Sequence, residues 1–239
     1  MSSTHSLDIP ETTRTTVDIL LGPENVRRQA RVAEIAAVYQ PVLKGVAAFF
    51  MLKHADNGEG LSEVEDLAGN EVLLMLDPGC GYFSTYDPTR GRLRHWIKSR
   101  IRRHVLDYRR KRRRVVASEL DEEKLPAEAQ IDQCIDELEM NEVFRLAMHL
   151  TAEHYAEKGQ SERFEIYKEL KSGAPRSPSV QAMSEWEMRS LKSEVASYIR
   201  QQALWQAALR VSDSPEDVYE LAGAVWDRAR NRKTLDLDF

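Results

Sequence analysis

Apolar residues recur every three to four positions through most of the chain, which is the spacing of an amphipathic helix. The first stretches with this pattern cover residues Val26–Tyr39, Val42–Phe50 and Val64–Leu76. We expect Pro41 to interrupt the first helix, because proline removes a backbone donor and clashes with the preceding turn. Ser62 and Glu65 have the spacing of a capping box, so a helix is expected to begin there.

The same periodicity returns in the second half of the chain, in Ile135–Tyr155, Phe164–Leu170, Met188–Ala203 and Val218–Val225. Ser184 and Glu187 form a second capping-box pattern, and Ser214-Pro215 is typical of a helix start. No stretch of any length alternates as a strand does, and no internal repeat is found. The pattern therefore predicts an all-α fold.

One predicted helix is densely basic. Its apolar stripe consists of Leu93, Ile97, Ile101, Val105 and Tyr108. Between Arg90 and Arg114 stand thirteen Arg and Lys residues and one acid, Asp107, although the whole chain carries a net charge of −5. A helix that buries one side and presents cations elsewhere favours a polyanion, and nucleic acid is the first candidate.

Three other interpretations of the basic run remain: a solvated helix face, a nuclear-localisation tract and a membrane-surface patch. Like charges this close together oppose helix formation when nothing neutralises them, which disfavours a solvated face. A localisation tract accounts for Arg109–Arg114 but not for the amphipathic helix before it.

Aromatic residues precede and enter the basic helix: Tyr82, Phe83, Tyr86 and Trp96. Rings beside cations can hold unstacked bases. We expect Trp96 in the core, because it lies beside the apolar stripe. For Phe83 and Tyr86, base binding and ordinary packing both remain open.

The segment from Glu119 to Glu139 reverses the charge, with nine acidic residues and one lysine, Lys124. Such a composition does not pack a core, so we expect an extended linker.

The rest of the composition is ordinary. The 239 residues suffice for two modest domains, no apolar run approaches a membrane span, and residues 1–20 are expected to form a flexible leader. Cys80 and Cys134 form no CxxC motif, and His149 and His154 share no helical face, so we expect a reducing cytoplasm and no metal.

The basic stretch also carries a family resemblance. The sequence from Asp87 to Arg114 resembles region 2 of extracytoplasmic-function sigma factors, whose pattern is roughly D-P-x-R-G-x-F-R-x-W/F-L-x4-R-x4-D-x2-R-R. The matching positions are Trp96, Arg102, Asp107 and Arg110. Glu65-Asp66-Leu67 is similar to the E-D-L segment that precedes region 2 in this family, although the Gln that usually follows is missing.

The second half resembles region 4 of a sigma-factor subgroup. Residues Ala152–Gly159 and Phe164-Glu165 are similar to its R-E-E-Y-A-x-x-G-x-x-x-x-F-E pattern, and 183–200 align with the helix that enters the −35 element. Residues 172–178, rich in Pro and Ser, replace the first helix of the helix-turn-helix. The resemblance covers about Val32 to Val225.

The resemblance implies a bacterial sigma factor that directs promoter recognition, DNA melting and transcription initiation. Its domains would be a region 2-like domain (21–117), an acidic linker (118–134), a region 4-like helix-turn-helix domain (135–210) and a C-terminal helix and tail (211–239). The implied DNA-binding residues are Phe83, Tyr86, Arg92, Arg94, Lys98, Arg102, Arg103, Arg109, Arg110, Arg189, Lys192 and Arg200. The implied polymerase-binding residues are Glu65, Asp66, Leu67 and Glu71. The linker would run through the polymerase cleft, or serve as an inert tether.

The partners implied are bacterial core RNA polymerase and promoter DNA, with an anti-sigma factor or a regulatory kinase as further candidates and no membrane. We expect no cofactor and no enzymatic activity. An alternative is a sigma-like accessory protein that binds polymerase or DNA without selecting promoters. A nucleic-acid enzyme is disfavoured, because the sequence has no P-loop, no clustered metal ligands and no nucleophile–base arrangement.

Overall fold

The computed structural model describes residues 19–22, 26–51, 60–77, 80–116, 128–172 and 175–231. Within these ranges the chain forms helices and no strand, so the all-α prediction is confirmed. Residues 1–18 of the expected leader, the first part of the acidic linker and the end of the C-terminal tail lie outside the described residues. The flexible leader expected over residues 1–20 is wrong at its end, because residues 19 and 20 are helical and Leu20 is fully buried.

The chain divides into two compact units. Unit 1 comprises Met1–Glu139 and Arg210–Asp217, and unit 2 comprises Met140–Leu209 and Val218–Phe239. The division therefore falls inside a helix rather than in the expected linker. In addition, the short segment 210–217 belongs with the N-terminal half of the chain.

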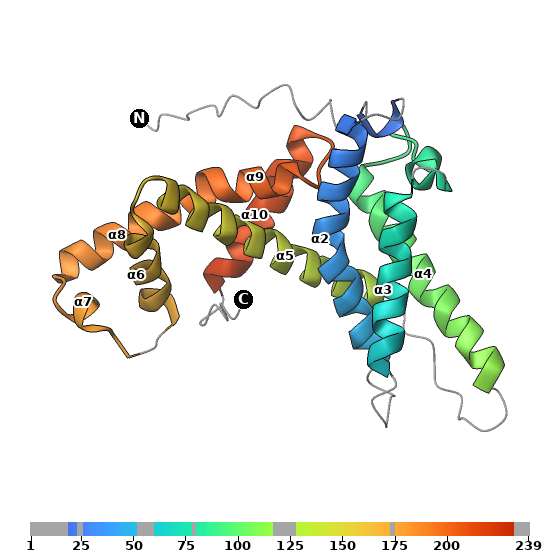
Figure 1. Cartoon of the computed structure of the whole chain (residues 1–239), viewed down its shortest axis with the longest axis horizontal. Coiled ribbons are helices and arrows are strands. Elements are labelled where there is room, and N and C mark those ends of the chain that lie inside the picture. Colours follow the sequence, from blue (N-terminus) through green and yellow to red (C-terminus); the bar gives the residue numbers. More distant parts are fainter. Residues whose placement is uncertain are drawn as a thin grey trace. The chain divides into compact units, whose positions relative to one another are not determined.

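Unit 1 is built on two long helices that lie side by side, α2 (Val26–Met51) and α3 (Gly60–Leu76) (Figure 1). Pro41 lies inside α2, so the expected interruption is wrong. Buried residues on both sides of the proline, Tyr39 and Val42 among them, hold the two halves against the same core. The second helix begins at Gly60, so Ser62 lies within it and the capping-box start expected there is also wrong.

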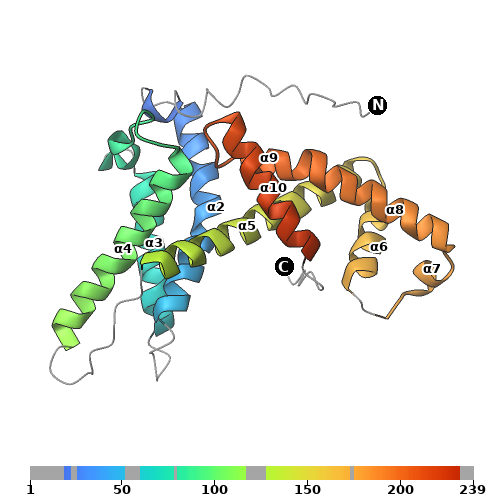
Figure 2. The same cartoon turned by 180° about the vertical axis from the view of Figure 1, so that it is seen from behind.

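The aromatic loop and the basic helix complete unit 1 as η3 (Tyr82–Thr85) and α4 (Leu93–Val116) (Figure 2). Leu93, Ile97 and Ile101 are fully buried, and Val105 is 3% exposed. The predicted apolar stripe of α4 is therefore confirmed.

Helix α5 (Glu128–Glu157) occupies much of the segment expected to be an extended linker, so that expectation is wrong for residues 128–139. Ile131 and Ile135 are fully buried and supply an apolar stripe. Asp132, Asp136 and Glu139 of this helix have cationic partners on α4, which removes the charge repulsion that an isolated acidic segment would have.

Helix α2 is also the one described helix long and apolar enough to cross a membrane by length and composition, over Val26–Phe49. The expectation that no run approaches a membrane span was therefore too strong. Half of its most apolar window is buried inside the protein, as in the core helix of a soluble domain. The helical fold is compatible with a cytoplasmic protein.

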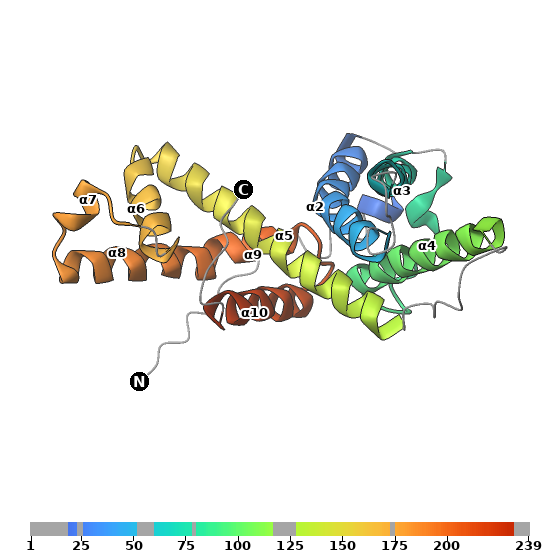
Figure 3. The ribbon, with the colours of Figure 1, turned by 90° about the horizontal axis from the view of Figure 1, so that it is seen from below.

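Unit 2 contains the rest of α5 and shorter helices: α6 (Ser161–Ser172), α7 (Pro178–Gln181), α8 (Glu185–Tyr198), η4 (Ile199–Ala203), α9 (Leu204–Leu209) and α10 (Pro215–Asn231), whose first turn belongs to unit 1 (Figure 3). The capping box of Ser184 and Glu187 is confirmed at the start of α8. The π-helical turn η4 joins α8 to α9 without a break. Ser214 accepts a hydrogen bond from the Asp217 N–H at 3.1 Å, as expected at a helix start.

Candidate nucleic-acid interface

Three predicted DNA-binding cations form a row along α4, because Arg94, Lys98 and Arg102 are four residues apart and share one helix face. Each lies against carboxylates of α5. Arg102 donates to Asp132 at 2.8 Å, and Lys98 pairs with both Asp136 and Glu139, the second at 2.9 Å. The row is therefore neutralised within unit 1.

The N-terminal end of this row meets the segment 210–217. Arg92 donates to Asp217 at 3.3 Å, and the Nε of Arg94 lies 3.6 Å from the same carboxylate. Asp217 has no exposed surface and Arg94 is 7% exposed. A buried charge of this kind is stable only beside an opposite charge, so Arg94 and Asp217 depend on each other.

Glu139 connects the cations to the core of unit 1. It is 1% exposed, accepts a hydrogen bond from the Tyr39 hydroxyl at 2.6 Å, and lies 3.9 Å from Arg94. Burial and the nearby Glu139 carboxylate raise the pKa of Tyr39 well above its ordinary value, so the hydroxyl remains a donor. The carboxylate thus has a donor from α2 and cations from α4.

The aromatic loop is packed inward. Phe83 is 1% exposed and Tyr86 is 4% exposed. Both rings lie against half-buried Trp96, with centroids 5.8 and 5.7 Å away. The Tyr86 hydroxyl donates to Asp213 at 2.5 Å. In this structure neither ring presents a free face to a base, and ordinary packing accounts for both.

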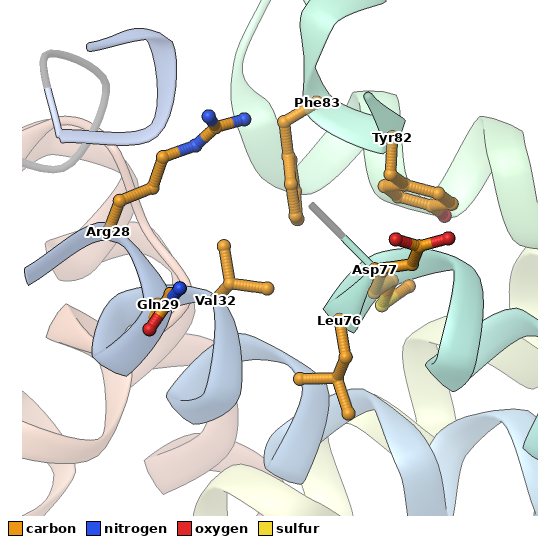
Figure 4. A pocket seen from close by; sticks show the side chains of 8 residues that line it. Arg28, Gln29, Val32, Leu76, Asp77, Tyr82 and Phe83 are labelled. Atoms are coloured by element: carbon orange, nitrogen blue, oxygen red, sulfur yellow. The ribbon is translucent and has the colours of Figure 1, made fainter. Parts of the chain in front are cut away.

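A pocket of about 260 Å³ adjoins this loop, between α2, the end of α3 and η3 (Figure 4). Its lining residues are Arg28, Gln29, Val32, Met75, Leu76, Asp77, Tyr82 and Phe83. The ring of Phe83 forms one wall, while Arg28 and Asp77 place opposite charges at its margins. The pocket is thus mainly apolar with a polar edge.

The remaining predicted cations of α4 differ in exposure. Arg103 and Arg110 are exposed, and Arg110 donates to Asp107 at 3.2 Å. The side chain of Arg109 lies outside the described residues. Arg100, which was not among the predicted residues, stacks over the Tyr82 ring at 4.6 Å. Among the predicted cations of α4 whose side chains the structure describes, Arg103 and Arg110 are therefore the exposed ones.

In unit 2 the predicted DNA-binding residues Arg189 and Lys192 lie on α8, whereas Arg200 lies in η4. Arg189 is exposed and pairs with Glu185 at 2.8 Å. Lys192 is half-buried, and Arg200 lies 6.0 Å from the centre of the Trp226 ring. The helical spacing places all three on one side together with a single acid, Glu185, so that side carries an excess of positive charge.

The predicted polymerase-binding residues separate into two pairs. Glu65 and Asp66 are exposed, whereas Leu67 is 7% and Glu71 2% exposed. Glu71 pairs with His104 at 3.0 Å and accepts the Tyr82 hydroxyl at 2.7 Å. Only the exposed pair is presented to a partner. Asp66 and Leu67 also line a pocket of about 360 Å³ between α3 and α4.

Sequence reasoning missed the residues that neutralise α4: Asp132, Asp136, Glu139, Asp213 and Asp217. The first three could have been found, because their three-to-four spacing around Ile131 and Ile135 is that of a helix face. Nothing in the local sequence marks Asp213 as a partner of α4. Among the described residues, no three His, Cys, Asp or Glu side chains are placed to share a metal ion.

Comparisons of the chain with protein-family models, with curated proteins and with solved structures each gave no match.

Proposed function

We propose that this chain acts in transcription initiation as a sigma factor that binds core RNA polymerase and directs it to promoters. The observation that supports this proposal most strongly is the structure of helix α4. Most of the region 2 pattern of Asp87 to Arg114 falls on this helix, whose apolar stripe is buried from Leu93 to Val105, and the aromatic loop lies shortly before it. A helix anchored in this way can hold phosphates through its remaining faces.

In this function α4 contacts the −10 duplex, and the exposed acids Glu65 and Asp66 of α3 contact the polymerase. Opening the DNA requires the aromatic loop to rearrange, because Phe83 and Tyr86 are buried. Unstacking a base costs a few kcal/mol, which stacking on an aromatic ring can offset. The protein needs no enzymatic activity, since melting is driven by binding.

The test is run-off transcription with core polymerase and a library of promoter fragments, with and without the protein. A sigma factor yields transcripts that start at a defined position and share an upstream sequence. Polymerase binding without any promoter-specific transcript would contradict the proposal.

A second candidate, a sigma-like accessory protein, is favoured by a specific observation. Of the three predicted cations on α8 and η4, Arg189 is already paired with Glu185, Lys192 is half-buried and Arg200 lies over the Trp226 ring. Such a surface attracts phosphates weakly. An accessory protein would bind polymerase in a pull-down with purified components and change transcription only when another sigma factor is present.

A further inference from the structure

The cations of α4 and the carboxylates of α5 form two matching rows. Lys98 and Arg102 lie one helical turn apart, and so do Asp136 and Asp132. The pairs run in opposite order along the two helices, because the later cation, Arg102, meets the earlier acid, Asp132. Figures 2 and 3 show the start of α5 lying beside α4.

The same acidic surface continues over the N-terminal end of α4. Asp217 faces Arg92 and Arg94, and Asp213 accepts the Leu93 backbone N–H at 2.6 Å. The N-terminus of a helix is a common binding site for phosphate. Here a carboxylate of the chain itself occupies that position.

The five carboxylates therefore hold the cations and the helix start of α4 to which the proposed function assigns DNA phosphates. We propose that Asp132, Asp136, Glu139, Asp213 and Asp217 form an acidic cover over the polyanion-binding face of α4. Duplex DNA binds this face fully only after the start of α5 has moved away. The inference rests on the proposed function, since it takes DNA to be the polyanion.

The outer part of the acidic cover is accessible to solvent. Asp132 and Asp136 have side chains that are 44% and 50% exposed, so solvent screens their pairs with Arg102 and Lys98. Ion pairs that solvent reaches in this way add less to stability than fully buried ones. DNA, with its higher charge density, can compete for the same cations.

The covered face of α4 adds a row of cations to those on the exposed face. Among the side chains of α4 that the structure describes, the exposed ones are His95, Ser99, Arg103, Asp107, Arg110 and Lys111, and Arg110 is paired with Asp107. Arg94, Lys98 and Arg102 form a second row on the covered face, with one helical turn between successive cations. Opening the acidic cover therefore adds phosphate contacts to those that the exposed face can make.

The experiment compares duplex DNA binding by the full chain and by the double variant Asp132→Asn/Asp136→Asn, across a range of salt concentrations. The variant removes the Asp132 partner of Arg102 and one of the two carboxylate partners of Lys98, which adds about one to two phosphate contacts, so the slope of log affinity against log salt becomes steeper by about 0.9 to 1.8. Between 50 and 200 mM salt the variant should lose about three- to twelvefold more affinity than the parent, starting from tighter binding at low salt.

The matched control is Glu153→Gln/Glu157→Gln, which removes two exposed carboxylates from the same helix, α5, within unit 2. A third protein carries Asp132→Asn/Asp136→Asn together with Lys98→Gln/Arg102→Gln. The proposal expects no gain for the control, and expects the gain of the first variant to disappear in the third. Circular dichroism checks that each protein is folded. If the double variant does not fold, Asp136→Asn alone is the milder variant, because it leaves Lys98 paired with Glu139.

An equal gain in the test and control variants would show an effect of net charge alone and would overturn the acidic cover. So would unchanged binding in the test variant. If binding is unchanged, run-off transcription separates the acidic cover from the proposed sigma function. A protein that still initiates at promoters keeps its sigma function without an acidic cover, whereas a protein that neither binds DNA nor initiates overturns both.

Discussion

The carboxylate of Asp213 accepts the backbone N–H of Leu93 at 2.6 Å, so a residue 120 positions further along the chain caps helix α4. The same oxygen accepts the Tyr86 hydroxyl at 2.5 Å. Burial and the Asp213 carboxylate raise the pKa of Tyr86 above its ordinary value, which keeps the hydroxyl a donor. The aromatic loop, the start of α4 and the segment 210–217 are therefore joined through one carboxylate.

Replacing Asp213 by alanine should lower the free energy of unfolding by about 1–2 kcal/mol, because the helix start loses its acceptor. Asp213→Asn should cost less, since the amide oxygen can still accept the N–H. Urea unfolding followed by circular dichroism measures both. Glu216→Ala, which removes an exposed acid from the same segment, is the control, and an equal loss in the control would contradict the capping role.

The exchange Phe83→Ala should lower the free energy of unfolding by about 3–5 kcal/mol, because the ring is 1% exposed. Strand opening is therefore better tested with Phe83→Leu, which fills most of the space. If the ring also holds a base, Phe83→Leu should reduce the fluorescence of a base analogue at the −10 element while duplex binding stays intact. Normal opening by Phe83→Leu would assign the ring to packing alone.

Two neighbouring arginines of α4 should respond differently to substitution, because Arg103 is exposed and Arg102 is paired with an acid. Arg103→Ala should weaken duplex binding at all sequences and reduce the salt slope by about one. Arg102→Ala should have a smaller effect on the parent protein, because Asp132 already holds that guanidinium at 2.8 Å. Fluorescence anisotropy at several salt concentrations gives both slopes, and equal losses would mean that DNA reaches Arg102 freely.

The acid Glu71 should make stability depend on pH. Its burial would raise the pKa, but hydrogen bonds from His104 and Tyr82 outweigh burial and lower the pKa below 4.5. A carboxylate with a lowered pKa stabilises the fold above its unfolded value, and this contribution is lost as the pH falls through the folded value. Glu71→Gln should therefore be less stable than the parent near pH 6, with the difference shrinking below about pH 4.5. Urea unfolding at several pH values checks this, and a constant difference would contradict it.

Two glycines should respond in opposite ways to alanine. Gly159 follows α5 with φ of 66°, and the Gln160 N–H donates to the Tyr155 carbonyl at 2.7 Å, as in a Schellman motif. Gly159→Ala should cost about 1–2 kcal/mol, because this conformation crowds a side chain. Gly223 lies within α10 with open space around it, so Gly223→Ala should stabilise by about 0.5–1 kcal/mol. Thermal unfolding measures both, and shifts of the same sign would contradict the assignment.

The features that could be predicted from the sequence are those that depend on residues a few positions apart. The capping box at Ser184, the start of α10 and the buried stripe of α4 all follow from spacings of three or four positions. The errors came from distant partners. Pro41 stays helical because tertiary packing outweighs its local effect, and the acidic segment folds because its carboxylates face α4. The pairing of Asp213 with Leu93 has no local signal at all.

Residues 210–217 are made after Met140–Leu209 of unit 2, yet they close the start of a helix in unit 1. Contacts between residues so far apart in sequence form late and slow the folding of a domain. During synthesis on the ribosome, α4 emerges well before Asp213 and Asp217. A nascent chain therefore carries its cationic face without this part of the acidic cover, and only completion of the chain through Asp217 allows the face to close.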